Sequence, residues 1–116
     1  MCLTINEYQQ LALRTESEVD ATKINNPRLL QGLMGLNGEA GECIDILKKH
    51  LCQGHWFDKM HLAKELGDVA WYLAISADAI GFTLEDIFKM NVDKLKERYP
   101  NGFEVEASTN RKDGDV

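Results

Sequence analysis

Apolar residues recur at helical spacing along most of the chain, and no stretch alternates apolar and polar residues as a strand would. The first helical segment begins with a capping-box sequence, Thr4 to Glu7, and is expected to end near Ser17. The second begins at Asn26, which can cap a helix and is followed by a proline suited to the first helical position. This segment should end at Gly54, a natural helix stop.

Two further helices are predicted in the second half of the chain. One runs from about Asp58 to Ala79, just before a glycine. The other begins with Thr83 as its N-cap and ends before Pro100. Residues 104–116 are polar and lack periodicity, so we expect a disordered tail after a single helical domain at residues 1–103.

Four glycines at intervals of three lie within the second predicted helix: Gly32, Gly35, Gly38 and Gly41. Each costs a helix interior about 1 kcal/mol relative to alanine, so their presence needs a reason. One reason is the close approach of another backbone or a ligand. The other is a break or kink around residues 35–38, and the sequence leaves both open.

Composition narrows the class of protein. The chain has 116 residues, 44% of them hydrophobic, and no apolar run near the roughly 20 residues that a membrane span needs. Its N-terminus lacks the basic and apolar regions of a signal peptide, and its three cysteines are widely spaced, so we expect a reduced, cytoplasmic protein. A net charge of −6 argues against nucleic-acid binding, but a bound divalent cation would still permit a small anionic substrate.

Two acidic pairs with i, i+3 spacing carry the most chemical information. Glu39 and Glu42 lie in the second predicted helix, and Glu65 and Asp68 lie in the third. Side chains three apart project from one side of a helix, so facing helices would bring four carboxylates together. Such a cluster is costly without a cation, and hard oxygen ligands favour Mg²⁺ or Mn²⁺. The alternative interpretation is a pair of solvated helix faces.

Other polar residues follow the same faces and are candidate substrate contacts. One lysine lies two turns after Glu42, one tyrosine lies one turn after Asp68, and three residues share the edge of the last apolar stripe. Lysine, arginine and asparagine can donate to phosphate oxygens, although each is also an ordinary surface residue. These candidates are Lys49, Tyr72, Asn91, Lys94 and Arg98.

A zinc site is a competing hypothesis. Cys52, His55 and His61 are near one another in sequence and are of the types that bind zinc. A fourth ligand at ordinary spacing is missing unless Cys43 or His50 is recruited. These residues are more simply interpreted as helix-end and loop residues.

Four segments together resemble the MazG-like nucleoside triphosphate pyrophosphohydrolases. They occur in order over residues 4–103: NEYQQLALRT at 6–15, GLNGEAGE at 35–42, KELGDVAWYL at 64–73 and KLKERYP at 94–100. The family pairs a Glu-x-x-Glu helix with a Glu-x-x-Asp helix. Many members have two adjacent glutamates at the start of the first motif, whereas glycine precedes the first glutamate of this chain.

The resemblance implies an all-α bundle of four to five helices, completed by assembly as a homodimer or homotetramer. The broad apolar faces on so short a chain also favour such assembly. The resemblance further implies Mg²⁺, with Mn²⁺ as a substitute, bound by the catalytic carboxylates, one of which (Glu39 or Glu42) would activate water. Lys49 and the basic and amide residues of the last helix would hold the triphosphate. The implied metal ligands are Glu39, Glu42, Glu65 and Asp68.

The implied reaction is hydrolysis of a (deoxy)nucleoside triphosphate between the α- and β-phosphates, giving monophosphate and pyrophosphate. Its expected setting is housecleaning of the cytoplasmic nucleotide pool, with no membrane or nucleic-acid partner. Two alternatives remain: a related enzyme for a specialised nucleotide, such as dUTP or phosphoribosyl-ATP, and a non-catalytic helical interaction module.

Overall fold

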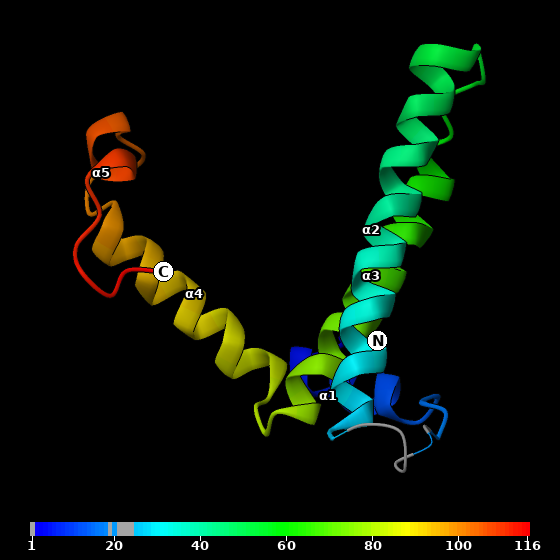
Figure 1. Ribbon diagram of the computed structural model, residues 1–116, viewed down its shortest axis with the longest axis horizontal. Helices are drawn as coiled ribbons and strands as arrows, with labels where there is room; N and C mark the ends of the chain where they lie inside the picture. The colour runs from blue at the N-terminus through cyan, green and yellow to red at the C-terminus, as the bar shows by residue number, and fades with distance from the viewer. Residues whose placement is uncertain (1, 19, 21–24) are drawn as a thin grey trace. The chain divides into compact units, whose positions relative to one another are not determined.

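The regular secondary structure is helical in the residues that the computed structural model describes, which are 2–18, 20 and 25–116. No strand occurs within these ranges, where the only extended pairing is an isolated bridge between Pro100 and Gly102. The predicted all-α class is therefore confirmed (Figure 1). The five helices are α1 (Ile5–Leu13), α2 (Pro27–Gln53), α3 (Lys59–Ala79), α4 (Leu84–Arg98) and α5 (Val105–Thr109).

Three helices begin at or close to the residues where the sequence predicted their starts, and a side chain caps each of them. The side chains of Thr4, Asn26 and Asp58 each accept a hydrogen bond from the backbone N–H three residues later, at 3.1, 3.3 and 3.1 Å. These bonds satisfy N–H groups that have no partner within the helix. Gly54 ends α2 with a φ of 71°, a left-handed conformation that glycine adopts without strain.

The chain forms two compact units, residues 1–84 and residues 85–116, and each is described by itself. In the first unit, α2 and α3 lie side by side as an antiparallel hairpin, and α1 packs against α3 (Figure 1). The short connection at residues 54–58 enforces this antiparallel arrangement. The hairpin is the scaffold on which both acidic pairs lie.

The core of the first unit is small. Ala12 of α1, Ala74 of α3 and Leu84 at the start of α4 form a buried cluster, and Ile75 is fully buried as well. Three partly buried side chains pack against this cluster: Tyr8, Trp71 and Leu73. The core therefore fixes α1 to the C-terminal half of α3.

The glycines of α2 are explained in part by close approach. The helix is unbroken over 27 residues, so the alternative of a broken helix is wrong. Gly32 faces Ser76 and Gly35 faces the ring of Tyr72, and neither position leaves room for a methyl group. A Cβ at either of the next two glycines of the series would meet nothing within 4 Å.

The second unit contains α4 and α5. The guanidinium of Arg98 donates to both carboxylate oxygens of Asp115, at 2.9 and 2.6 Å, and Lys94 Nζ donates to the backbone oxygen of Val116 at 2.7 Å. The sequence pattern gave no indication of α5, which lies in the segment predicted to be disordered. The domain boundary at residue 103 stays a prediction.

Among the helices described, none combines the length and the apolar character that a membrane crossing requires.

Candidate metal site

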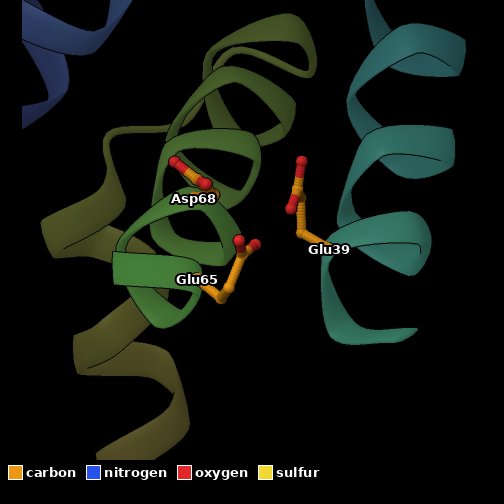
Figure 2. A group of neighbouring side chains, drawn as sticks. All are labelled: Glu39, Glu65 and Asp68. Atoms are coloured by element: carbon orange, nitrogen blue, oxygen red, sulfur yellow. The ribbon is translucent and has the colours of Figure 1, made fainter. Parts of the chain in front are cut away.

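Three carboxylates meet between α2 and α3. Glu39 projects from α2 toward Glu65 and Asp68, which lie one turn apart on α3 (Figure 2). One oxygen from each of the three lies within 4.8 Å of the others. The structure therefore brings together three of the four acidic residues that the sequence singled out.

The register of the hairpin explains why these side chains meet. Along α2, Gly35 and Glu39 are one turn apart, and along α3, Tyr72 and Asp68 are one turn apart. Because the helices are antiparallel and Gly35 faces Tyr72, the next turn of each helix places Glu39 opposite Asp68. The contact between glycine and tyrosine thus aligns the carboxylates.

The electrostatics of the site favour a proton or a cation. The pKa of Glu39 is raised above its usual range, first by a hydrogen bond with the Glu65 carboxyl and then by partial loss of hydration. The negative charges of Asp68, Glu65 and Glu42 raise it further. The positive charge of a divalent cation would relieve the same repulsion. The cluster supplies only carboxylate oxygens, which are the ligands that hard cations prefer.

Glu42 is exposed and lies outside the group of three, although its charge acts on Glu39. Positions three apart on a helix differ in direction by about 60°, so when Glu39 faces α3 directly Glu42 lies toward the edge of the helix pair. Cys43, one turn after Glu39, lies closer than Glu42 to the direction in which Glu39 faces α3. Burial raises the pKa of its thiol first, and the carboxylates, with Glu65 foremost, raise it further. The spacing of the acidic pairs did not indicate that the thiol of Cys43 would feel the charge of these carboxylates.

The alternative zinc ligands do not come together. Within the described part of the chain, the group of potential metal ligands that converges contains no cysteine or histidine. His50 Nδ1 instead lies 2.8 Å from the backbone oxygen of His55, and His61 Nε2 lies 3.4 Å from Glu65 at a neighbouring turn of α3. The structure gives no support to the zinc hypothesis.

Two predicted substrate contacts lie in the first unit. Lys49 forms an ion pair with Asp45 at 3.0 Å, which helps to hold the pKa of that carboxyl below its usual range. The ring of Tyr72 packs against Gly35 and meets Trp71 edge to face, with 4.8 Å between ring centroids. Tyr72 therefore lies between the two helices, one turn from the carboxylates.

The other three predicted contacts lie in the second unit. Asn91 is exposed on α4. Lys94 and Arg98 are engaged by Val116 and Asp115, respectively. Their roles toward a substrate stay predictions.

Tyr8 of α1 approaches the same turn of α3 from another side. Its hydroxyl donates to the backbone oxygen of Gly67 at 3.5 Å, next to Asp68. Burial raises the pKa of the Tyr8 hydroxyl, and the charge of Asp68 raises it further. The sequence placed Tyr8 on the apolar side of the first helix but gave no sign that it would lie beside the acidic residues.

Comparison with known proteins gives a family match across the site. The model of the MazG nucleotide pyrophosphohydrolase domain matches residues 29–103. The chain is 35% identical to the Gene 37 protein of Mycobacterium phage L5 over 82 residues, covering 67% of this chain and 72% of the phage protein. It is 44% identical over 41 residues to the uncharacterized protein YvdC of Bacillus subtilis strain 168, covering 35% of this chain and 39% of YvdC. No solved structure matches. Domains of this family generally depend on a divalent metal.

Proposed function

This chain belongs to the MazG nucleotide pyrophosphohydrolase family, and on that premise we propose that it hydrolyses (deoxy)nucleoside triphosphates between the α- and β-phosphates with Mg²⁺. The products are a nucleoside monophosphate and pyrophosphate. The observation that carries the proposal is the convergence of Glu39, Glu65 and Asp68 within the segment that the family model matches. Mn²⁺ is the expected substitute because it accepts the same oxygen ligands.

In the proposed mechanism, Glu39, Glu65 and Asp68 would hold the cation. A cation held there would supply positive charge that stabilises the triphosphate and the departing pyrophosphate. Glu42 lies outside the group of three, so its carboxylate is free to orient the attacking water and to accept its proton. This division assigns three of the four acidic residues to metal binding and the fourth to proton transfer.

The proposed substrate contacts are cationic or hydrogen-bonding groups suited to phosphate oxygens. Lys49 would exchange its ion pair with Asp45 for a phosphate, and Arg98 would exchange Asp115 in the same way. The support for these roles is their side-chain chemistry and the family resemblance. The full set is Lys49, Tyr72, Asn91, Lys94 and Arg98.

Assembly as a homodimer or homotetramer is part of the proposal. Large apolar side chains of the α2–α3 hairpin are exposed, several by half or more of their surface. So much exposed apolar surface is typical of an interface rather than of a monomer. Light scattering coupled to size exclusion is the direct test, and a monomer at micromolar concentration would count against assembly. The exposed side chains are Leu33, Met34, Ile44, Leu51, Met60 and Leu66.

The proposed biological setting is control of the cytoplasmic nucleotide pool by removal of dNTPs or noncanonical nucleotides. Its support is the family resemblance together with three free, widely spaced cysteines, which suit a reducing compartment.

The test is product analysis by chromatography and ³¹P NMR after incubation with each common dNTP and NTP, with Mg²⁺ or with EDTA. The expected products are monophosphate and pyrophosphate, and EDTA should abolish both. Diphosphate and orthophosphate would refute the proposed cleavage position. A panel without turnover, extended to dUTP and phosphoribosyl-ATP, would favour the non-catalytic interaction module.

A matched pair of variants links the activity to the carboxylate cluster. Glu65→Gln should lower kcat/KM by about 100-fold or more, because one metal ligand loses its charge. Glu18→Gln makes the same chemical change at an exposed position before α2 and should leave kcat/KM unchanged. Equal activity of the two variants would remove the proposed role of Glu65.

A further inference from the structure

The separation between α2 and α3 next to the carboxylates is fixed by two close contacts. Gly32 lies against Ser76, and Gly35 lies against the ring of Tyr72. We propose that Gly35 and Tyr72, supported by the contact between Gly32 and Ser76, are positioning residues that set the spacing of the metal ligands. They would thereby determine the affinity for the divalent cation and its preferred size. This inference rests on the proposed function, because it concerns the same cation.

The contacts and the carboxylates form one continuous series along the hairpin. Gly32, Gly35 and Glu39 follow one another at intervals of three and four on α2, which keeps them on one face. Ser76, Tyr72 and Asp68 follow at intervals of four on α3, in the opposite direction. Each step is about one helical turn, or 5.4 Å. The carboxylates are therefore the next step of a series whose first two members are close helix contacts.

The contact at Gly35 resists adjustment. A Cβ there would overlap three atoms of the Tyr72 ring, and an aromatic ring has no flexible end that could yield. The adjacent Trp71 lies edge to face with Tyr72, and its indole N–H donates to Thr15 Oγ1 at 2.7 Å. A side chain at position 35 must therefore push the helices apart or displace a restrained ring.

The contact at Gly32 is also too close for a methyl group, but it involves a small hydroxyl rather than a ring. A Cβ there would overlap the hydroxyl of Ser76 and would lie 3.3 Å from its Cα. Ser76 is 7% exposed, and its hydroxyl has no hydrogen-bond partner among the described residues. Removal of this hydroxyl therefore relieves the overlap without breaking a described hydrogen bond.

A change in helix separation acts on Mg²⁺ more than on a larger cation. Mg²⁺ requires nearly ideal octahedral geometry, with oxygens at about 2.0–2.1 Å, whereas Ca²⁺ accepts oxygens at about 2.3–2.6 Å in a flexible arrangement. Glu39 reaches the cation from α2, while Glu65 and Asp68 reach it from α3. Wider helix separation should therefore weaken Mg²⁺ binding and shift the preference toward Ca²⁺.

Gly38 of the same helix provides a matched control for a substitution at Gly35. Gly35→Ala and Gly38→Ala are the same substitution in the same helix, one turn apart, but a Cβ at Gly38 meets nothing within 4 Å. We expect Gly35→Ala to lower Mg²⁺ affinity by about tenfold or more and to lower Ca²⁺ affinity less. Changes in residues that orient metal ligands typically have effects of this size. Gly38→Ala should keep both affinities and should unfold at the same or a higher temperature, since alanine is the better helix former.

The measurement is calorimetric titration of the metal-free protein with MgCl₂ and with CaCl₂, with far-UV circular dichroism to check that the helices are intact. A folded Gly35→Ala variant that binds both cations like the wild type would overturn the inference. A loss of Mg²⁺ and Ca²⁺ affinity by the same factor would also overturn it, because the size preference would be unchanged. Absence of binding by the wild type at millimolar cation would overturn the proposed metal site itself and, with it, the inference.

A second pair of variants decides the case if Gly35→Ala does not fold. Gly32→Ala should lower the ratio of Mg²⁺ to Ca²⁺ affinity, and Gly32→Ala combined with Ser76→Gly should restore the ratio, since the glycine is moved to the other helix and the space is kept. If the combined variant is folded and the ratio stays at the value for Gly32→Ala, helix separation does not set the preference. If Gly32→Ala leaves the ratio unchanged, the inference is likewise wrong.

Discussion

Gln9 is a buried amide on which the assembly of the first unit depends. Its side chain lies on α1 and is 2% exposed. Nε2 donates to the backbone oxygens of Ala74 and Phe82, at 3.1 and 3.4 Å, and Oε1 accepts a hydrogen bond from the backbone N–H of Leu84 at 3.0 Å. One side chain thus ties α1 to the end of α3 and to the first residue of α4. We predict that Gln9→Ala strongly destabilises the fold.

The size of the effect follows from what the substitution leaves behind. The N–H of Leu84 is at a helix start, has no helical partner and lies at a residue that is 2% exposed. Leaving such a buried donor without an acceptor costs about 1–3 kcal/mol. The cavity left by the missing side chain adds about 1 kcal/mol. The total is roughly 2–4 kcal/mol, a large part of the 5–15 kcal/mol that is typical of a domain.

The assay is urea unfolding of the metal-free protein followed by circular dichroism. Gln10→Ala is the matched control, because it makes the same change in helix propensity at the exposed neighbouring position. Gln9→Glu should be at least as damaging as Gln9→Ala at neutral pH, since a carboxylate cannot donate to the two backbone oxygens. If the free energy of unfolding of Gln9→Ala lies within about 0.5 kcal/mol of that of Gln10→Ala, the reasoning is refuted.

Three further predictions concern other parts of the chain. The raised pKa of Glu39 means that the metal-free fold keeps a proton that the unfolded chain has released, so this contribution to stability should fall as pH rises through the folded pKa. Melting curves between about pH 4 and 7 should show that fall, with Mg²⁺ reducing it, and a flat profile would contradict the shift. Trp71→Phe should lower the free energy of unfolding in urea by about 0.5–1.5 kcal/mol, because the hydrogen bond from the indole to Thr15 is removed. An unchanged midpoint would mean that this bond contributes nothing to stability. Arg98 holds the pKa of Asp115 below its usual range, so NMR titration should give a low value that Arg98→Gln raises, and a normal value in the wild type would count against the ion pair.

The helices could be predicted because their ends depend on local chemistry. Thr4, Asn26 and Asp58 cap the helices that follow them, and Gly54 ends α2 in a left-handed conformation. These interactions span only a few residues, so the sequence carries them directly. The role of Gln9 could not be predicted in this way, because its partners are more than sixty positions away and become neighbours only after packing.

The sequence was enough to predict a cluster of carboxylates between two helices, but not which of the acidic residues would form it. Spacing of three places Glu39 and Glu42 on the same side of α2, but it does not say which of them points directly at α3. That choice depends on the rotation of α2, which is fixed by the contacts of Gly32 and Gly35 with α3. Lys49 follows the direction of Glu42 and pairs with a residue of its own helix. Tertiary packing therefore distinguishes positions that the helical pattern treats as equivalent.

The same packing bears on the choice between a metal site and a solvated acidic surface. Carboxylates on a solvated surface can rotate apart and gain hydration, so nothing requires three of them to converge from two helices. In this hairpin, close contacts one and two turns away hold Glu39 opposite Glu65 and Asp68, at a cost in helix propensity of about 1 kcal/mol for each glycine. A bound divalent cation would offset both this cost and the repulsion of the carboxylates. We therefore propose metal binding, rather than solvation alone, as the reason for the convergence.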